Sequence, residues 1–204
     1  GRSFTSRRGV AVQHGKKIFN MSASFQIEED GLNHQDSMPE VESFKDLPSE
    51  HQLRKKIIDK LPDEYKESFN KEWPVEVRPI NPVDLMSPEP KEPQNYIWFK
   101  ARSSLPDIVS LHQCVLAYMS DMTLLDTCTN PHGVNFMNPN LHSASLDHAM
   151  WFHRPFKADE WLLYHQDSPS ASGARGFNRG SIFDLNGNLI ASVAQEGLIR
   201  FTQN

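Results

Sequence analysis

The sequence predicts an α+β fold in which a curved antiparallel sheet wraps around one long helix. The stretch 107–125 carries apolar residues at steps of three and four, the spacing of side chains that share one helical face. One β-rich segment precedes this stretch and several follow it, the last two joined at Asn186-Gly187, a pair typical of tight hairpin turns. A single helix with strands on both sides in the chain favours an antiparallel sheet that curls around it.

Composition excludes several classes of protein. The chain has 204 residues, of which 38% are hydrophobic and 10% aromatic, so it can bury a core and is not disordered. Its net charge of -5 gives no global basic field, so we expect no nucleic-acid partner. No apolar run approaches the roughly 18 residues of a membrane helix, so we expect no membrane span. The two cysteines, Cys114 and Cys128, form no CxxC motif and suit a reducing cytoplasm, which is the predicted location.

The first third of the chain reads as a hairpin, a linker and two short helices. The β-rich segments 2–12 and 17–27 form the predicted hairpin, and the polar segment 28–44 follows as a linker. Ser49 and Gln52 match a capping box that opens a helix ending near Leu61, and 63–71 predicts a second helix. A proline-rich stretch then allows only an edge-like strand over 75–80.

The remaining elements follow the same logic. Aromatic residues predict a strand over 94–103, before the long helix, which Pro106 and Asp107 are placed to open. Apolar residues from Cys114 to Met119 extend to its other faces, so we expect a helix buried nearly all round, with Cys114 in the core. An irregular loop over 126–141 comes next. The predicted strands after it are 143–153, 161–166, 175–184 and 189–201.

The first and last hairpins are similar in sequence. Setting Gly15 against Gly187 also pairs Arg7 with Arg179 and Ile18 with Ile190. Two unrelated hairpins can share such matches, but a true duplication would give the unit that starts near residue 75 a partner beginning upstream of residue 1. The expectation is then a longer native polypeptide, or a second chain that supplies the missing segment.

Asp121 is the candidate for chemistry on the long helix. A carboxylate that leaves water beside an apolar run must be paired, hydrogen-bonded or protonated, although Asp121 can equally lie exposed on the last turn. His142, His148 and His153 make a poor metal site, because strand alternation sends 148 and 153 to opposite faces. The same alternation argues against a catalytic pairing of Ser145 with His148.

Three long motifs carry a resemblance to a known family. The segments SASLDHAMWFHRPFKADEWLLY (143–164), ARGFNRG (174–180) and ASVAQEGLIR (191–200) closely resemble the type II acyl-CoA thioesterases, the double-hotdog family. SFTSRRGVAVQHGKKIFNMSASFQ (3–26) resembles the end of that family's first repeat. The resemblance implies a truncated first hotdog ending in a hairpin (1–28), a linker with short helices (29–73) and a complete second hotdog (74–204) that carries the catalytic residues.

The resemblance also implies a catalytic set. Asp121 matches the family's helix aspartate, Ser145 the hydroxyl residue and Gln195 the glutamine of the last strand. The implied reaction is hydrolysis of an acyl-CoA to a fatty acid and free CoA, with no metal and no cofactor. Asp121 takes a proton from a water that Ser145 and Gln195 position. In bacterial members of the family the commoner hydroxyl residue is threonine, and the serine at position 145 lacks the β-branching that restricts χ1.

Substrate contacts and partners complete the expectations. Arg154, Arg175 and Arg179 are candidates for CoA phosphates, or are ordinary surface charges. Trp151, Phe152 and neighbouring aromatic residues are core residues or the lining of an acyl tunnel. We expect a homo-oligomer, as is common in the family. The alternative function is a non-catalytic acyl-CoA binding or assembly module.

Overall fold

The computed structural model describes residues 2–202 and divides into two compact units, Gly1–His34 and Gln35–Asn204. The first unit is the predicted hairpin, formed by antiparallel strands β1 (Phe4–Gln13) and β2 (Lys16–Gln26). His14 and Gly15 at its turn both have positive φ, 49° and 75°, the left-handed geometry that tight hairpin turns require. Most side chains of both strands are exposed within this unit.

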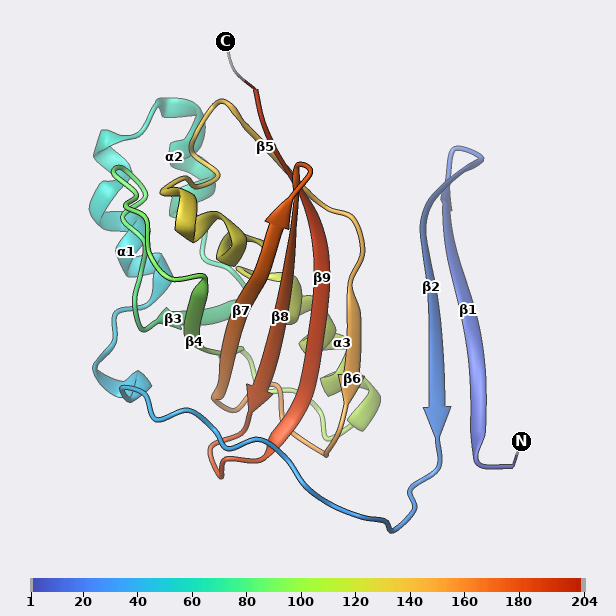
Figure 1. The fold of residues 1–204 in the computed structure, drawn as a ribbon. Helices are drawn as coiled ribbons and strands as arrows, with labels where there is room; N and C mark the ends of the chain where they lie inside the picture. The colour runs from blue at the N-terminus through green and yellow to red at the C-terminus, as the bar shows by residue number, and fades with distance from the viewer. Residues whose placement is uncertain (1, 203–204) are drawn as a thin grey trace. The chain divides into compact units, whose positions relative to one another are not determined.

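The second unit contains a seven-stranded antiparallel sheet with the order β3-β4-β7-β8-β9-β5, in which β6 also pairs with β9 (Figure 1). The closing hairpin turns at Asn186-Gly187, as predicted, and β3 is an edge strand, as its proline requires. The strands are β3 (Val75–Pro79), β4 (Gln94–Ala101), β5 (Leu141–Ser145), β6 (Ala149–Phe152), β7 (Leu162–Ser172), β8 (Arg175–Phe183) and β9 (Leu189–Phe201).

Helix α3 (Val109–Asp121) packs against this sheet and completes the main core. Leu116 and Met119 of the helix are fully buried among Phe99, Tyr164 and Ile190 of three strands. Each side chain of this size contributes about 1.5–3 kcal/mol when it leaves water. The predicted curved sheet around one long helix is therefore confirmed for this unit.

Two expectations about α3 were wrong. The helix begins at Val109 with Ile108 as an N-cap that makes no side-chain bond, and Asp107 pairs with Lys157 in place of capping it. The helix is also buried on one face only, since Cys114 and Tyr118 are exposed. The apolar spacing identified residues that share a face, but apolar residues on the outer faces need not be covered by the same chain.

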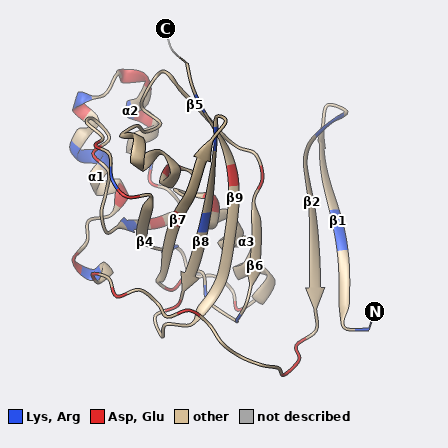
Figure 2. Ribbon diagram, in the orientation of Figure 1, with Lys and Arg blue, Asp and Glu red and all other residues tan. Residues whose placement is uncertain are grey.

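The linker is tied to the outer side of the sheet by a second small core. Helix α1 (Glu50–Ile57) opens with the predicted capping box of Ser49 and Gln52, and α2 (Asp63–Asn70) follows it. Trp98 of β4 donates its indole N–H to the carbonyl of Glu42 at 2.9 Å and packs with Leu47. Figure 2 shows charged residues gathered on α1, α2 and their connections, with few on the strands.

The predicted strand over 143–153 is two strands in the structure. The chain leaves the ladder between Ser145 and Ala149, where the backbone N–H groups of Leu146 and Asp147 both donate to the carbonyl of Glu196, at 2.9 and 3.3 Å. Two donors on one carbonyl place two residues opposite one, as in a β-bulge. The inward and outward alternation of side chains therefore does not continue from β5 into β6.

Candidate functional site

Asp121 is the last residue of α3, and its side chain is 56% exposed. Its Oδ1 accepts a hydrogen bond from Gln195 Nε2 at 2.7 Å and a longer one from the Ser145 hydroxyl at 3.4 Å. The carboxylate is therefore accessible to water. Its direction is fixed by Gln195 of β9, which lies 74 residues further along the chain.

The serine and the glutamine reach Asp121 from two paired strands. Ser145 ends β5 and lies opposite Gly197 of β9, which places it diagonally across the ladder from Gln195. The Gln195 amide nitrogen also donates to Ser145 Oγ at 2.7 Å. The structure thus brings together all three residues of the sequence-predicted set.

Gln195 is the buried member of this cluster, with no exposed surface. Because its Nε2 donates to both Asp121 and Ser145, its orientation is fixed and Oε1 points away from them. Within the described part of the chain, that oxygen has no hydrogen-bond partner. The amide therefore acts as a rigid donor between the helix end and β5.

Two further side chains hold the end of α3. The hydroxyl of Tyr164 on β7 donates to the carbonyl of Ser120 at 2.9 Å, and burial, with the nearby charge of Asp121, raises the pKa of this phenol well above its usual value. It therefore remains a donor. Thr123 has φ of 68°, an uncommon conformation for a β-branched residue, and its hydroxyl accepts from Gln166 Nε2 at 2.8 Å.

His148 also reaches the site, which sequence reasoning missed. Its Nε2 lies 2.8 Å from Ser120 Oγ, and its Nδ1 lies 3.9 Å from Asp121 Oδ1. Strand alternation does not determine which way His148 faces, because the break after β5 interrupts it, and Ser145 and His148 both approach Asp121 Oδ1. No sequence signal marks that break, since it depends on the carbonyl of Glu196 in a distant strand.

The three candidate arginines each have a protein partner. Arg154 donates to the carbonyl of Leu189 at 2.7 Å, Arg175 pairs with Glu196 at 2.9 Å, and Arg179 pairs with Asp167. Contact with CoA phosphates stays a prediction for all three.

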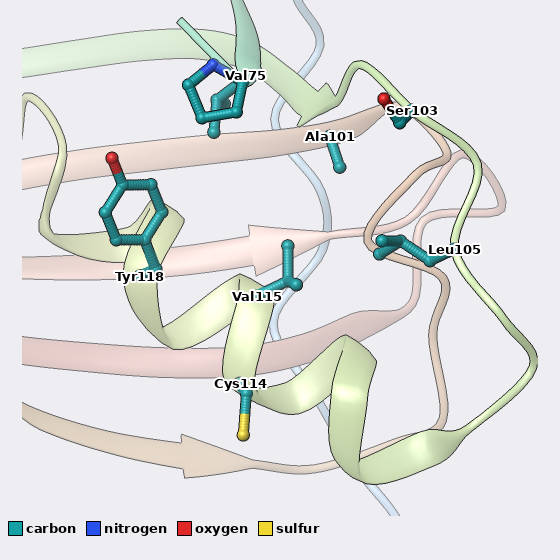
Figure 3. A pocket seen from close by; sticks show the side chains of 8 residues that line it. Val75, Ala101, Ser103, Leu105, Cys114, Val115 and Tyr118 are labelled. Carbon is teal, nitrogen blue, oxygen red and sulfur yellow. The ribbon is translucent and has the colours of Figure 1, made fainter.

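An apolar pocket of about 360 Å³ lies beside α3. Figure 3 shows Val115 and Tyr118 on the side of the helix that faces Val75, with Leu105 at the other end. Tyr118 lies three residues before Asp121, so the pocket begins within one helical turn of the carboxylate. Trp151, expected in the core or a tunnel lining, is 55% exposed and does not line this pocket, whereas Phe156 and Trp161 pack against the two cores.

Residues 2–202 show neither the side-chain cluster of a metal site nor a helix of membrane-spanning type. In this range, no three His, Cys, Asp or Glu side chains gather as a metal ion would need. None of its helices has both the length and the apolar composition to cross a bilayer.

Solved structures of other proteins define the class of fold. A protein from Alicyclobacillus acidocaldarius described as having a hot dog fold aligns with a TM-score of 0.74 at 16% identity, covering 100% of this chain and 70% of that chain. The acyl-CoA thioesterase II TesB2 from Mycobacterium marinum aligns with a TM-score of 0.76 at 44% identity, covering 100% of this chain and 71% of that one. The fold is therefore a hotdog fold.

Sequence comparisons define the family. The acyl-CoA thioesterase family model matches residues 64–198. The chain is 38% identical to acyl-CoA thioesterase 2 of Haemophilus influenzae, over 100% of this chain and 71% of that protein. It is 41% identical to acyl-coenzyme A thioesterase 8 of mouse, over 98% of this chain. The match covers 64% of the mouse protein, which is less than two thirds of its length. The chain belongs to the acyl-CoA thioesterase family, which confirms the resemblance and the class of enzyme predicted from the sequence.

Proposed function

We propose that this protein hydrolyses acyl-CoA thioesters with a water molecule activated by Asp121. The observation that carries the proposal is the convergence of Asp121, Ser145 and Gln195 at one accessible point. An exposed carboxylate can take a proton, and a hydroxyl held by an amide can fix the water that gives it up.

The proposed reaction needs no covalent intermediate on the protein. The water oxygen forms a bond to the thioester carbonyl carbon while Asp121 takes one of its protons. The carbon–sulfur bond then breaks, and the departing thiolate of CoA receives that proton. The products are a fatty acid and free CoA, and Asp121 returns to its carboxylate form. Positioning supplies most of the acceleration in such a scheme, because the thioester carbonyl is already electrophilic.

We place the acyl chain in the apolar pocket beside α3. The pocket starts at Tyr118, one turn from Asp121, and extends past Val115 to Leu105. The seven residue-to-residue steps of helix from Cys114 to Asp121 span about 10 Å. A substrate whose carbonyl lies at Asp121 can therefore direct its hydrocarbon along the helix towards Leu105.

Release of free thiol from acyl-CoA esters of increasing chain length tests the activity. We expect Asp121→Asn to lower kcat by about 10² to 10⁴, the usual contribution of a general base. Asp107→Asn is the matched control, since Asp107 is an exposed carboxylate just before the same helix, paired with Lys157. Equal rates for wild type and Asp121→Asn would contradict the role of Asp121. Tight acyl-CoA binding without thiol release would favour the alternative function, a binding or assembly module.

The domain assignment and the surroundings of the chain are also proposals. We assign 1–28 to the end of a first hotdog unit, 29–73 to a linker and 74–204 to the second hotdog. The exposed apolar side chains of the first hairpin, such as Val12 and Phe19, support pairing with further strands of a first unit, in a longer chain or a second chain. The intact mass of the natural protein tests this proposal.

A cytoplasmic location and a homo-oligomer remain part of the proposed function. The free thiols of Cys114 and Cys128 suit a reducing compartment. The exposed apolar side chains of Ile108 and Val109, at the start of α3, support an interface with another hotdog unit. Fractionation of the source cells tests the location, and light scattering after gel filtration tests the oligomeric state.

A further inference from the structure

His148 lies against the proposed general base without belonging to the predicted catalytic set. It occupies the break between β5 and β6, and its side chain is 24% exposed. One ring nitrogen, Nε2, lies 2.8 Å from Ser120 Oγ. The other, Nδ1, lies 3.9 Å from Asp121 Oδ1, which is too far for a direct hydrogen bond.

The contacts of Ser120 determine which ring nitrogen carries the proton. Ser120 is fully buried, and its hydroxyl donates to the carbonyl of Ala117 at 2.9 Å. A hydroxyl has one hydrogen, and a carbonyl can only accept, so this bond uses the serine's proton. With the serine hydrogen on that carbonyl, and not on Met150 Sδ at 3.7 Å or on the imidazole ring, His148 Nε2 donates to Ser120 Oγ. We assign the neutral ring to the tautomer with hydrogen on Nε2, which leaves Nδ1 as a bare acceptor that faces Asp121.

Two acceptors at this separation can hold one water molecule between them. A water oxygen about 2.8 Å from both atoms would see them at an angle of about 90°, close to the angle between the two O–H bonds of water. Such a water donates one hydrogen to Asp121 and one to His148. Its lone pairs then point away from both acceptors, towards an approaching electrophile.

The charged and titratable groups on the neighbouring elements are already paired with other partners. On α3 the facing group is Asp121 itself, and on β7 the phenol of Tyr164 is committed to the Ser120 carbonyl. Glu196 of β9 pairs with Arg175, and the neighbouring Asp147 accepts the backbone N–H of Glu196 at 2.8 Å.

We infer that His148 is a further catalytic residue, whose Nδ1 accepts the second hydrogen of the attacking water and thereby orients its lone pair towards the thioester carbonyl. This inference rests on the proposed hydrolysis and adds a fourth group to it. Asp121 still takes the transferred proton, and the ring stays neutral throughout. Atoms and charges balance as in the three-residue scheme.

Two substitutions separate the two ring nitrogens. His148→Gln can place an amide N–H near the position of Nε2 and keep the bond to Ser120, but it offers no acceptor at Nδ1. His148→Asn can place its amide oxygen near Nδ1 but does not reach Ser120. We expect the Gln variant to lose up to about a hundredfold in kcat with KM nearly unchanged, since misplacing a reacting group costs that much. The Asn variant should recover part of the loss.

His153→Gln is the matched control, because His153 Nε2 lies 2.8 Å from Ser192 Oγ in the same kind of contact, without Asp121 nearby. The inference would be overturned if His148→Gln were as active as wild type, or if His148→Asn were no more active than His148→Gln. The proposed hydrolysis would still stand in that case, provided that Asp121→Asn is inactive. Absence of thiol release by wild type would be a failure of the proposed function, and the inference would fall with it.

A measurement on the unmodified protein keeps the inference testable if the variants do not fold. The ¹⁵N chemical shifts of the His148 ring report directly which nitrogen is protonated. We expect hydrogen on Nε2 and a bare Nδ1 in the neutral ring. A neutral ring with hydrogen on Nδ1 would refute the assignment, because that nitrogen could then not accept from water.

Discussion

Replacing Gln195 with Met removes the side-chain amide that bonds to both Asp121 and Ser145, the other two residues of the predicted set. Methionine fills nearly the same buried volume, so the packing of β9 should survive. Two bonds of 2.7 Å are lost, one of them to a carboxylate. A bond to a charged group contributes about 1.5–3 kcal/mol, but Asp121 is 56% exposed and water can replace the amide, so we expect a loss of unfolding free energy near the lower end, about 1–2 kcal/mol.

The effect on catalysis should exceed the effect on stability. Without the amide, Asp121 and Ser145 can each move relative to the bound water, and a loss of about 1.4–2.8 kcal/mol of transition-state stabilisation corresponds to a fall of roughly 10- to 100-fold in kcat. Thiol release at saturating acyl-CoA measures kcat, and urea unfolding measures stability. Asn178→Leu is the control, since Asn178 is a buried amide directly opposite Gln195 on β8. It should lower stability while kcat changes little. A Gln195→Met variant with kcat within twofold of wild type would refute the reasoning.

Three further predictions concern the body of the fold. Gly180→Ala would drive a Cβ into the fully buried ring of Tyr164 and should cost about 1–3 kcal/mol of unfolding free energy in urea, whereas Gly31→Ala, in open space, should cost almost nothing. Burial raises the pKa of the Cys128 thiol to about 11, so a thiol reagent at neutral pH should modify the exposed Cys114 only, and modification of both in the folded protein would contradict this. The backbone N–H of Leu105 donates to Asp159 and lowers the pKa of that carboxyl below its ordinary 3.8. The ionised carboxylate therefore stabilises the fold above pH 3.8, and this contribution is lost as the pH falls further. Between pH 5 and 3, thermal melts should show that Asp159→Asn loses less stability than wild type.

The elements of the fold were largely predictable because each has a local signal. The capping box at Ser49, the Asn186-Gly187 turn and the prolines around β3 each determine backbone geometry within a few residues. The exposed face of α3 was not predictable, since periodicity groups side chains by face without saying what covers each face. Cys114 lies on such an uncovered face, although the same spacing would also fit a core position.

The candidate site was predictable only in part. Asp121, Ser145 and Gln195 were named through a family resemblance, and their proximity required the coordinates, because they come from three elements far apart in the chain. His148 was excluded by a rule that holds only along an unbroken strand. The break follows from two N–H groups meeting one carbonyl of β9, a contact with no signature in the local sequence.

The sheet, more than the helix, determines where Asp121 points. A helix end is ordinarily free to fray, and the carboxylate itself is mostly in water. Three buried side chains restrain it here: Tyr164 binds the carbonyl of Ser120, Gln166 binds the hydroxyl of Thr123, and Gln195 binds the carboxylate. The positive φ of Thr123, which costs about 1–3 kcal/mol, persists because the strand beside it supplies the compensating bond. An accessible acid with a fixed direction therefore depends on fully buried groups in β7 and β9, which can be rigid because they are packed away from solvent.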